Sequence, residues 1–243
     1  MKLELKDVEQ QYGGHAVLKS LTLELESFQV LAIVGVSGSG KSTLLRLLAG
    51  LQPLQRGEIL LNGEPIPKKE ARVNEYRQSV GIVFQSFNLF PHLSALANIA
   101  LPLVLVHGYS KEASEERAYE LLKRFSLDGH ALKKPYQLSG GQCQRIAILR
   151  AIAVRKRLLL FDEPTSALDP LMTAEVLDLI TELKEESCIV IASHHMGFVQ
   201  NVSDHAIFLS DGRIIESQPT KSFFSSPLHE ETRLFLRTIL KYG

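Results

Sequence analysis

One segment combines glycines, a lysine and hydroxyl side chains in an order suited to binding phosphate. It reads Gly35-Val36-Ser37-Gly38-Ser39-Gly40-Lys41-Ser42 and is followed by Thr43. The order fits the pattern G-x-x-x-x-G-K-S/T, in which backbone N–H groups converge on an anion at the start of a helix. We expect Lys41 to reach the β- and γ-phosphates of a nucleotide and the Ser42 hydroxyl to bind Mg²⁺. The alternative is a glycine–serine loop with an unrelated lysine.

Two carboxylates follow the apolar run Leu158–Phe161, which reads as a buried strand. Ligands of open α/β sheets bind at the carboxyl ends of the strands, where Asp162 and Glu163 would stand. Asp162 can hold Mg²⁺ through water, and Glu163 can accept a proton from an attacking water. The alternative is a solvated acidic pair that ends a strand.

A second glycine motif, Leu138-Ser139-Gly140-Gly141-Gln142, precedes the helical run Ile146–Val154. A hydroxyl and two glycines at a helix N-terminus can bind another anion. Taken alone, the motif is equally consistent with a helix cap and a loop.

The elements that must position these residues alternate between strands and helices. The apolar and polar residues of Lys2–Val8 and Val17–Leu25 alternate, which predicts two antiparallel strands. Val30–Val34 is apolar throughout, as a strand covered by helices on both faces must be. Further strands are predicted at Gly57–Leu61, Val80–Phe84, Leu158–Phe161 and Ile189–Ala192, and a hairpin turning at Asp211-Gly212. Helices are predicted at Ser42–Ala49, Lys111–Phe125 with Ser110 as N-cap, Thr173–Glu186 and Leu228–Leu240.

This pattern predicts an α/β fold with a parallel core. We expect a P-loop NTPase core with an N-terminal antiparallel β-subdomain and an inserted helical subdomain. The whole chain, 1–243, is then one domain, with a RecA-like core at 1–87 and 156–243 and the helical subdomain at 88–155.

Composition excludes several classes of protein. The 243 residues carry 27 basic and 27 acidic side chains, which gives a formal net charge of +0 and no general attraction to nucleic acid. Two distant cysteines argue against a disulfide framework. The longest apolar stretch, Ile99–Val106, contains Pro102 and is far shorter than the roughly 20 residues that span a bilayer. We therefore expect an intracellular chain that does not cross a membrane.

The order of these motifs resembles that of the nucleotide-binding subunit of an ATP-binding cassette (ABC) transporter, and the resemblance covers essentially the whole chain. Six segments of the chain match the family's motifs in the family's order. They are Walker A at Gly35–Ser42, the Q-loop at Gln85, the signature at Leu138–Gln142, Walker B at Leu158–Glu163, the D-loop at Ser166–Asp169 and the switch histidine at His194.

The resemblance implies roles that spacing alone does not supply. Tyr12 matches the aromatic residue that stacks on adenine, and Gln85 the residue that contacts Mg²⁺ or the attacking water. Asp169 would stabilise a dimer near the nucleotide, and His194 would hydrogen-bond the γ-phosphate. The implied cofactors are ATP and Mg²⁺.

Two positions depart from the family's pattern. His195 stands where related importers usually have glutamate, and Cys143 stands where glutamine usually follows the signature. The pair His194-His195 lacks a third ligand, so the sequence does not predict a zinc site.

The resemblance also implies partners. Two copies would face each other head to tail, with Ser139 and Gly141 of one against the phosphate held by Lys41 of the other. An integral membrane permease would dock near Asn88–Leu93 at the cytoplasmic face of the inner membrane, and a solute-binding protein would take part indirectly. The alternative for Asn88–Leu93 is core packing of the helical subdomain.

The class of cargo is inferred from sequence segments such as Phe84–His92 and Asp162–Pro170, which resemble those of bacterial importers of polar amino acids. Similar segments occur in methionine importers and lipoprotein-extracting systems. Other classes considered are a soluble ABC-type ATPase acting on nucleic acid or the ribosome, and an ATP-binding module without turnover. The balanced charge disfavours a nucleic-acid partner, and the presence of Glu163 and His194 disfavours a module without turnover.

Overall fold

The computed structural model describes residues 1–166 and 168–242 and confirms an α/β fold. A smaller antiparallel sheet has the strand order β2-β1-β4-β5. A larger sheet has the order β10-β9-β3-β8-β7-β6, in which neighbours pair in parallel except β9 with β10. The strands are β1 (Leu3–Tyr12), β2 (His15–Leu25), β3 (Val30–Val34), β4 (Arg56–Leu61), β5 (Glu64–Pro65), β6 (Val80–Val83), β7 (Leu158–Asp162), β8 (Cys188–Ala192), β9 (His205–Ser210) and β10 (Arg213–Pro219).

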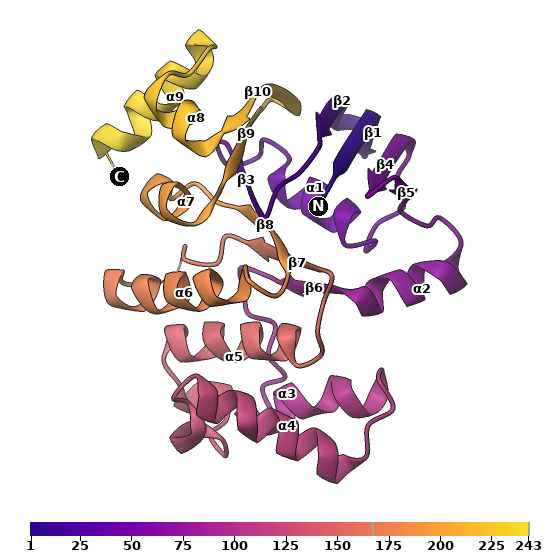
Figure 1. The fold of residues 1–243 in the computed structure, drawn as a ribbon, viewed down its shortest axis with the longest axis vertical. Helices are drawn as coiled ribbons and strands as arrows, with labels where there is room; N and C mark the ends of the chain where they lie inside the picture. The colour runs from indigo at the N-terminus through magenta and orange to yellow at the C-terminus, as the bar shows by residue number, and fades with distance from the viewer. Residues whose placement is uncertain (167, 243) are drawn as a thin grey trace.

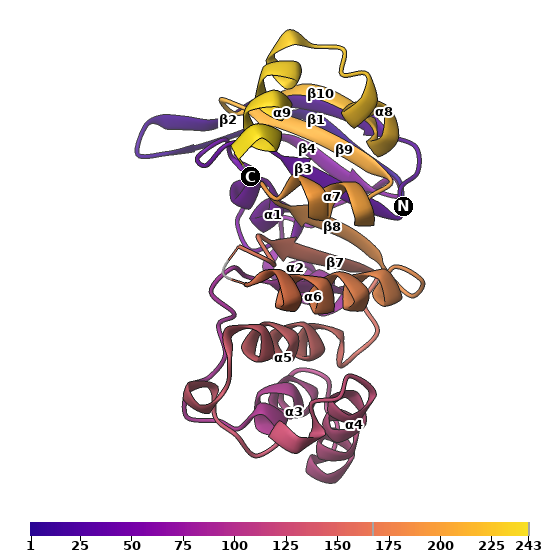
Figure 2. The same ribbon diagram turned by 90° about the vertical axis from the view of Figure 1, so that its left-hand side faces the viewer.

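Helices connect the strands and cover the larger sheet. They are α1 (Lys41–Leu48), α2 (Glu70–Ser79), α3 (Ala95–Leu105), α4 (Lys111–Arg124), α5 (Gly140–Ile152), α6 (Pro170–Leu183), α7 (Met196–Val202), α8 (Thr220–Ser225) and α9 (Glu230–Tyr242), with short 3₁₀-helices η1 (Asp128–His130) and η2 (Pro135–Gln137). Figures 1 and 2 show α6, then α5, then the pair α3 and α4, following one another away from the larger sheet. The chain runs from α5 directly into β7, and α6 follows β7.

The central strands are buried on both faces, as their apolar runs predict. Every residue of β3 and of β7 is buried. Alternate residues of β7 serve different cores, with Leu159 and Phe161 packing toward α3–α6 and Leu158 and Leu160 packing toward α1. The carboxyl end of β7 is consequently held rigidly, together with the side chains that follow it.

Helix α1 lies between the two sheets. Leu44, Leu45, Leu47 and Leu48 are buried in a core that also contains Leu3 and Leu5 of β1 and Leu31 and Ile33 of β3. Burying a leucine side chain contributes about 1.5–3 kcal/mol, so this packing fixes both ends of the loop that joins β3 to α1.

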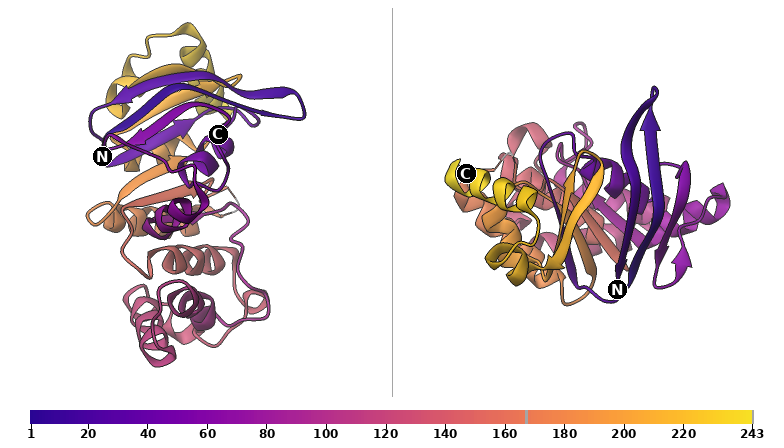
Figure 3. Two further views of the ribbon diagram at one scale, coloured as in Figure 1. Left: turned by 90° about the vertical axis from the view of Figure 1, so that its right-hand side faces the viewer. Right: turned by 90° about the horizontal axis from the view of Figure 1, so that it is seen from above.

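The hairpin of β1 and β2 projects from the rest of the molecule (Figures 2 and 3). Its strands pair antiparallel, as predicted, from Leu3 opposite Leu25 to Tyr12 opposite His15. Both strands extend further than the alternating pattern indicated, because Gly13 and Gly14, with φ of 54° and 82°, complete the turn by themselves.

Helix boundaries differ from the prediction where side chains cap the first turn. α6 begins at Pro170 rather than near Thr173, because Asp169 accepts a hydrogen bond from Met172 N. α5 begins at Gly140, six residues before the predicted apolar run, because Ser139 and Gln142 form a capping box. Ser110 caps α4 as predicted.

Helices α2 and α8 were not predicted from the sequence. In α2 the pattern is almost wholly polar, and Val73 is the residue that it buries. The apolar periodicity that identifies a helix is therefore missing there. Among the described residues no helix combines the length and the apolar character needed to cross a bilayer.

Candidate active site

Lys41 is the first residue of α1, and its ammonium group is folded back onto the preceding loop. Nζ donates hydrogen bonds to the carbonyl oxygens of Gly35 at 2.8 Å and Val36 at 3.1 Å, and the residue is 6% exposed. Burial lowers the pKa of Lys41, while the carboxylates of Glu163 and Asp162 act in the opposite direction. Neutral carbonyls are weaker partners for this cation than a phosphate would be, so an anion can replace them.

The loop from Gly35 to Gly40 packs closely against the β-hairpin. Gly38 and Gly40 have φ of 81° and 105°, values that favour glycine. A Cβ atom on Gly40 would lie 2.7 Å from Leu18 Cδ2, so the β-hairpin presses directly on the loop. Ser39 Oγ is buried and finds no hydrogen-bond partner among the described residues. An unpartnered hydroxyl and glycine-rich backbone at a helix N-terminus suit an oxyanion such as a nucleotide phosphate.

Ser42 and Asp162 form a pair of oxygen donors behind this loop. Ser42 Oγ donates a hydrogen bond to Asp162 Oδ1 at 2.8 Å, and Asp162 is 6% exposed. Burial raises the pKa of Asp162, an effect that the hydrogen bond from Ser42 partly offsets. A buried carboxylate beside a hydroxyl is the kind of donor set that Mg²⁺ prefers, so these residues fit that ion.

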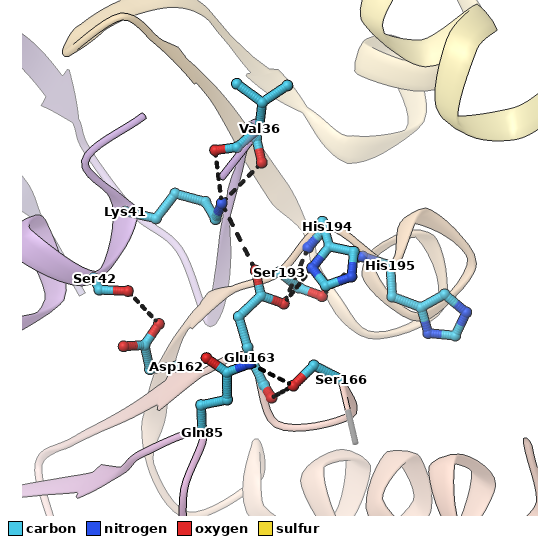
Figure 4. A network of polar contacts seen from close by, with 11 residues as sticks. Val36, Lys41, Ser42, Gln85, Asp162, Glu163, Ser166, Ser193, His194 and His195 are labelled. Atoms are coloured by element: carbon cyan, nitrogen blue, oxygen red, sulfur yellow. Dashed lines mark hydrogen bonds and ion pairs between the residues drawn. The ribbon is translucent and has the colours of Figure 1, made fainter. Parts of the chain in front are cut away.

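Glu163 turns its carboxylate toward two nitrogen groups (Figure 4). Oε2 lies 2.8 Å from His194 Nδ1, and Oε1 lies 3.7 Å from Lys41 Nζ. The backbone of Glu163 has φ of 51°, a left-handed conformation that is uncommon for glutamate, and its N–H donates to Ala192 O at 2.9 Å. This local backbone strain directs the side chain away from the course of β7 and toward the loop.

Gln85, two residues after β6, joins the site from its far side. Its Nε2 donates to Ser166 Oγ at 3.1 Å, and Ser166 Oγ donates to the carbonyl oxygen of Glu163 at 3.2 Å. The ends of β6 and β7 are thereby linked through one hydroxyl (Figure 4).

Tyr12 ends β1 at the tip of the hairpin that presses on the loop. The residue is 42% exposed, and its hydroxyl donates to the side chain of Gln52. An aromatic ring exposed to this extent can pack on a flat apolar group, as a base would be.

The second glycine motif lies at the start of α5. Ser139 Oγ accepts from Gln142 N at 3.2 Å, and Gln142 Oε1 accepts from Ser139 N at 3.0 Å. Asp169 lies close by as the N-cap of α6, whereas Ala167 of the predicted D-loop lies outside the described residues. Leu138 is half-buried and Gly141 buried, so the hydroxyl of Ser139 and the first backbone N–H groups of α5 are what the motif can offer a ligand.

The two residues that depart from the family's pattern, His195 and Cys143, lie outside this cluster of polar contacts. His195 is exposed and turned away from Glu163 (Figure 4). Cys143 is 7% exposed with Sγ 3.6 Å from Pro135 O, and burial raises the pKa of its thiol, so it acts as a packing residue.

The structure thus brings five of the sequence-predicted residues together, namely Lys41, Ser42, Asp162, Glu163 and His194. Gln85 reaches them through Ser166, which sequence reasoning had noted only as part of the D-loop. Sequence reasoning missed Met172, whose sulfur lies 3.8 Å from Ser139 Oγ. No sequence motif marks this methionine, which lies in the first turn of α6, three residues after the N-cap Asp169.

A phosphate-binding loop that opens a helix beside strand-end carboxylates places the chain among the P-loop nucleotide hydrolases. The profile of the ABC transporter family matches residues 18–166. The chain belongs to the ABC transporter family, as the order of its motifs predicted.

Several curated relatives match over nearly their whole length. The glutamate/aspartate import ATP-binding protein GltL of Escherichia coli is 44% identical over 239 residues, which cover 98% of this chain and 99% of the relative. The glutamine transport ATP-binding protein GlnQ of Bacillus subtilis is 42% identical over 241 residues, covering 99% and 100%. The general L-amino acid transport ATP-binding protein AapP of Rhizobium johnstonii is 42% identical over 239 residues, covering 98% and 93%.

Solved structures agree with this assignment. The ATP-binding cassette MJ0796, in a dimeric post-hydrolysis state bound to ADP and Pi, superposes with a TM-score of 0.80 at 33% identity. The match covers 90% of this chain and 98% of that one. A second dimeric structure of MJ0796 gives a TM-score of 0.81.

Proposed function

We propose that this chain is the ATP-hydrolysing subunit of an ABC importer for polar amino acids. The observation that carries the proposal is the convergence of Lys41, Glu163 and His194 on one point beside the Ser42–Asp162 pair. The names of the relatives GltL, GlnQ and AapP support the class of cargo.

ATP binds at the loop between β3 and α1. Lys41 exchanges its two carbonyl partners for the β- and γ-phosphates, and Ser39, now without a partner, donates to a phosphate oxygen. Tyr12 packs against the adenine. The residues proposed to contact this nucleotide are Tyr12, Gly35, Val36, Ser37, Gly38, Ser39, Gly40, Lys41, Ser42 and Thr43.

Ser42 and Asp162 would hold Mg²⁺, and Gln85, near the end of β6, would be a further ligand. When bound, Mg²⁺ neutralises charge that develops on the phosphate oxygens. The chain's own contribution is to keep one hydroxyl and one buried carboxylate 2.8 Å apart before the ion arrives.

Glu163 takes the proton of the attacking water, and His194 donates to the γ-phosphate. Glu163 is only slightly exposed, and its side chain already lies against the residue that would hold the γ-phosphate. Removal of Lys41 from this carboxylate, when the lysine turns to a phosphate, frees an oxygen for the water.

Two copies form the working unit, head to tail. Ser139 Oγ donates to the sulfur of Met172, a weak acceptor, so this hydroxyl can turn to the nucleotide of a second copy. Asp169 stands beside it and meets the same interface. ATP then favours closure because it contacts both copies only in the closed dimer. The dimeric cassette structures support this arrangement.

An integral membrane permease binds at residues 88–93, which places the chain at the cytoplasmic face of the membrane, with a solute-binding protein acting on the permease. We propose that these residues begin a helical subdomain, 88–155, set on a core of 1–87 and 156–243. Phe90 is 41% exposed, and Asn98 holds its backbone in place by accepting from Phe90 N at 2.7 Å. An exposed aromatic on a fixed backbone suits a docking helix.

Reconstitution tests the proposal. The chain is combined with the permease subunits encoded beside it, in vesicles, and uptake of labelled glutamate, glutamine and methionine is measured with ATP. The proposal expects ATP-dependent uptake of glutamate or glutamine. Uptake of methionine alone would make the chain a subunit of a methionine importer instead. Salt-sensitive binding to RNA or DNA without membrane association would replace the proposal by a soluble ATPase that acts on nucleic acid.

A further inference from the structure

Met172, in the first turn of α6, lies over the glycine motif at the start of α5. A Cβ atom added to Gly141 would lie 2.1 Å from Met172 Sδ, 2.9 Å from its Cγ and 3.0 Å from its Cβ. The sulfur is also 3.8 Å from Ser139 Oγ. The thioether side chain therefore occupies the space that any side chain at position 141 would need.

The position of Met172 is set by the loop that leads into α6. Asp169 Oδ1 accepts a hydrogen bond from Met172 N at 2.9 Å. Farther along the same two helices, Arg145 of α5 and Glu175 of α6 form an ion pair at 3.2 Å. A change of rotamer can move the sulfur of Met172, but it cannot move the Cβ atom, which stays with the capped turn.

The contact also governs the hydroxyl of Ser139. Its oxygen accepts from Gln142 N, and its proton points to the sulfur of Met172. A thioether is a weak acceptor, so the hydroxyl is held in one orientation and still free to donate to a stronger acceptor such as a phosphate oxygen.

We propose that Met172 is a positioning residue for this motif. Its side chain sets where Ser139 and Gly141 stand relative to the turn that Asp169 caps, and a shift of that turn moves both toward or away from the partner copy's nucleotide. The inference rests on the proposed function, because it concerns the motif's part in turnover.

A suppression experiment tests the contact. Gly141→Ala pushes α5 from α6 and lowers kcat for ATP by about a hundredfold or more, as errors near 1 Å do at catalytic sites. Met172→Ala in the same chain removes the sulfur and Cγ and leaves the 3.0 Å approach to Cβ. The double variant therefore recovers at least about tenfold in kcat over Gly141→Ala. The control, Gly141→Ala with Leu171→Ala, recovers nothing, because Leu171 is 74% exposed and not among the nearest atoms to Gly141.

Single variants separate positioning from packing. Met172→Ala lowers kcat about tenfold with KM for ATP changed less than about threefold, because the loop at Lys41 that sets affinity is left intact. Met172→Leu, which keeps the volume, restores kcat to within about threefold of the original. Equal kcat in the original chain and Met172→Ala overturns the proposal.

The outcomes distinguish a failure of the Met172 proposal from a failure of the proposed function. If Gly141→Ala keeps full turnover, the role of the motif is wrong, and the Met172 proposal falls with it. If Gly141→Ala is slow and the double variant is equally slow, Met172 is not what Gly141 must avoid, and the proposed function stands.

A spectroscopic readout covers variants that fold poorly. The chain has three methionines, so methyl-labelled methionine gives three NMR signals, and Met172→Leu assigns the one in question. In the Glu163→Gln chain, saturating Mg²⁺-ATP shifts the Met172 methyl signal and leaves that of Met1 in place. A Met172 signal that does not respond while the chain dimerises overturns the proposal.

Discussion

Glu163 Oε2 lies 2.8 Å from His194 Nδ1, so the carboxylate that directly follows β7 meets the histidine that follows β8. The other oxygen of Glu163 faces Lys41 Nζ at 3.7 Å. Without nucleotide, the proposed base is therefore held by the two groups that the proposed function assigns to the phosphates. In the proposed function, binding of ATP draws Lys41 away and leaves the histidine contact to orient the carboxylate.

The first prediction concerns Lys41→Ala. The substitution removes a cation whose hydrogen bonds to a charged ligand contribute about 1.5–3 kcal/mol, which corresponds to a loss of ATP affinity of roughly tenfold to a hundredfold. Titration calorimetry with ATP measures it. The matched control is Lys6→Ala, since Lys6 pairs with Glu4 on the surface of β1, and its affinity should equal that of the original chain. Unchanged affinity in Lys41→Ala would overturn the phosphate assignment.

The second prediction concerns Asp162→Asn. Asparagine can keep the hydrogen bond from Ser42 while removing a buried negative charge, so the nucleotide-free chain should be as stable as the original or more so. The same change weakens the Mg²⁺ site. If affinity for Mg²⁺-ATP falls tenfold, the stabilisation by saturating nucleotide falls by about 1.4 kcal/mol.

Thermal unfolding with and without Mg²⁺-ATP checks both halves of that prediction. Ser42→Ala serves as the comparison, because it removes the hydroxyl and keeps the carboxylate. An Asp162→Asn chain with the full Mg²⁺-dependent rise in Tm would show that Asp162 does not serve the ion.

A third prediction concerns Glu216 on β10, which is 3% exposed. Its carboxylate accepts from Leu228 N at 2.8 Å and His229 N at 3.0 Å, and so ties the segment before α9 to the sheet. Burial alone would raise the pKa of Glu216, but hydrogen bonds to the ionised form outweigh it and hold the pKa below its usual value. Glu216→Gln should lower the free energy of unfolding by about 2 kcal/mol at pH 7.

The pH dependence of this loss has a definite sign. Because the folded-state pKa is lowered, the ionised carboxylate stabilises the chain fully above the unfolded value of 4.5, and this contribution disappears as the pH falls through the folded value. The difference in Tm between the original chain and Glu216→Gln should therefore be constant from pH 6 to about pH 8 and shrink below about pH 4.5. A difference that grows in acid contradicts the assignment.

The sequence predicted those parts of the fold and site that consecutive residues determine. Gly35–Ser42 predicts a strand–loop–helix because its glycines and lysine are consecutive, and the buried strands β3 and β7 are evident as apolar runs. The alternating residues of β1 and β2 likewise predicted their antiparallel pairing.

What the sequence could not give depends on contacts between distant segments and on side-chain caps. The left-handed backbone of Glu163 has no signature in its residue type, and Met172 meets Ser139 across 33 residues through packing of α5 on α6. Helix α2 lacks apolar periodicity because it buries little, so pattern reading had nothing to detect.

The last prediction concerns Glu163→Gln. Glutamine keeps the shape of the side chain but cannot accept a proton from water, so hydrolysis should slow by about 10²–10⁴-fold, the usual contribution of a general base. ATP affinity should persist, because Lys41 and the loop are unchanged and the Glu163 carboxylate no longer faces the lysine. The chain should then accumulate as a dimer closed around uncleaved ATP, which light scattering coupled to gel filtration detects.

His194→Ala in the same experiment separates the two partners of that 2.8 Å contact. If the histidine acts chiefly by orienting Glu163 and the γ-phosphate, His194→Ala is slow as well, and Glu163→Gln with His194→Ala is little slower than either alone, because residues that act as a unit are not additive. Losses that multiply would mean that the two side chains act independently. Normal turnover in Glu163→Gln would remove Glu163 as the base and leave the proton to another acceptor.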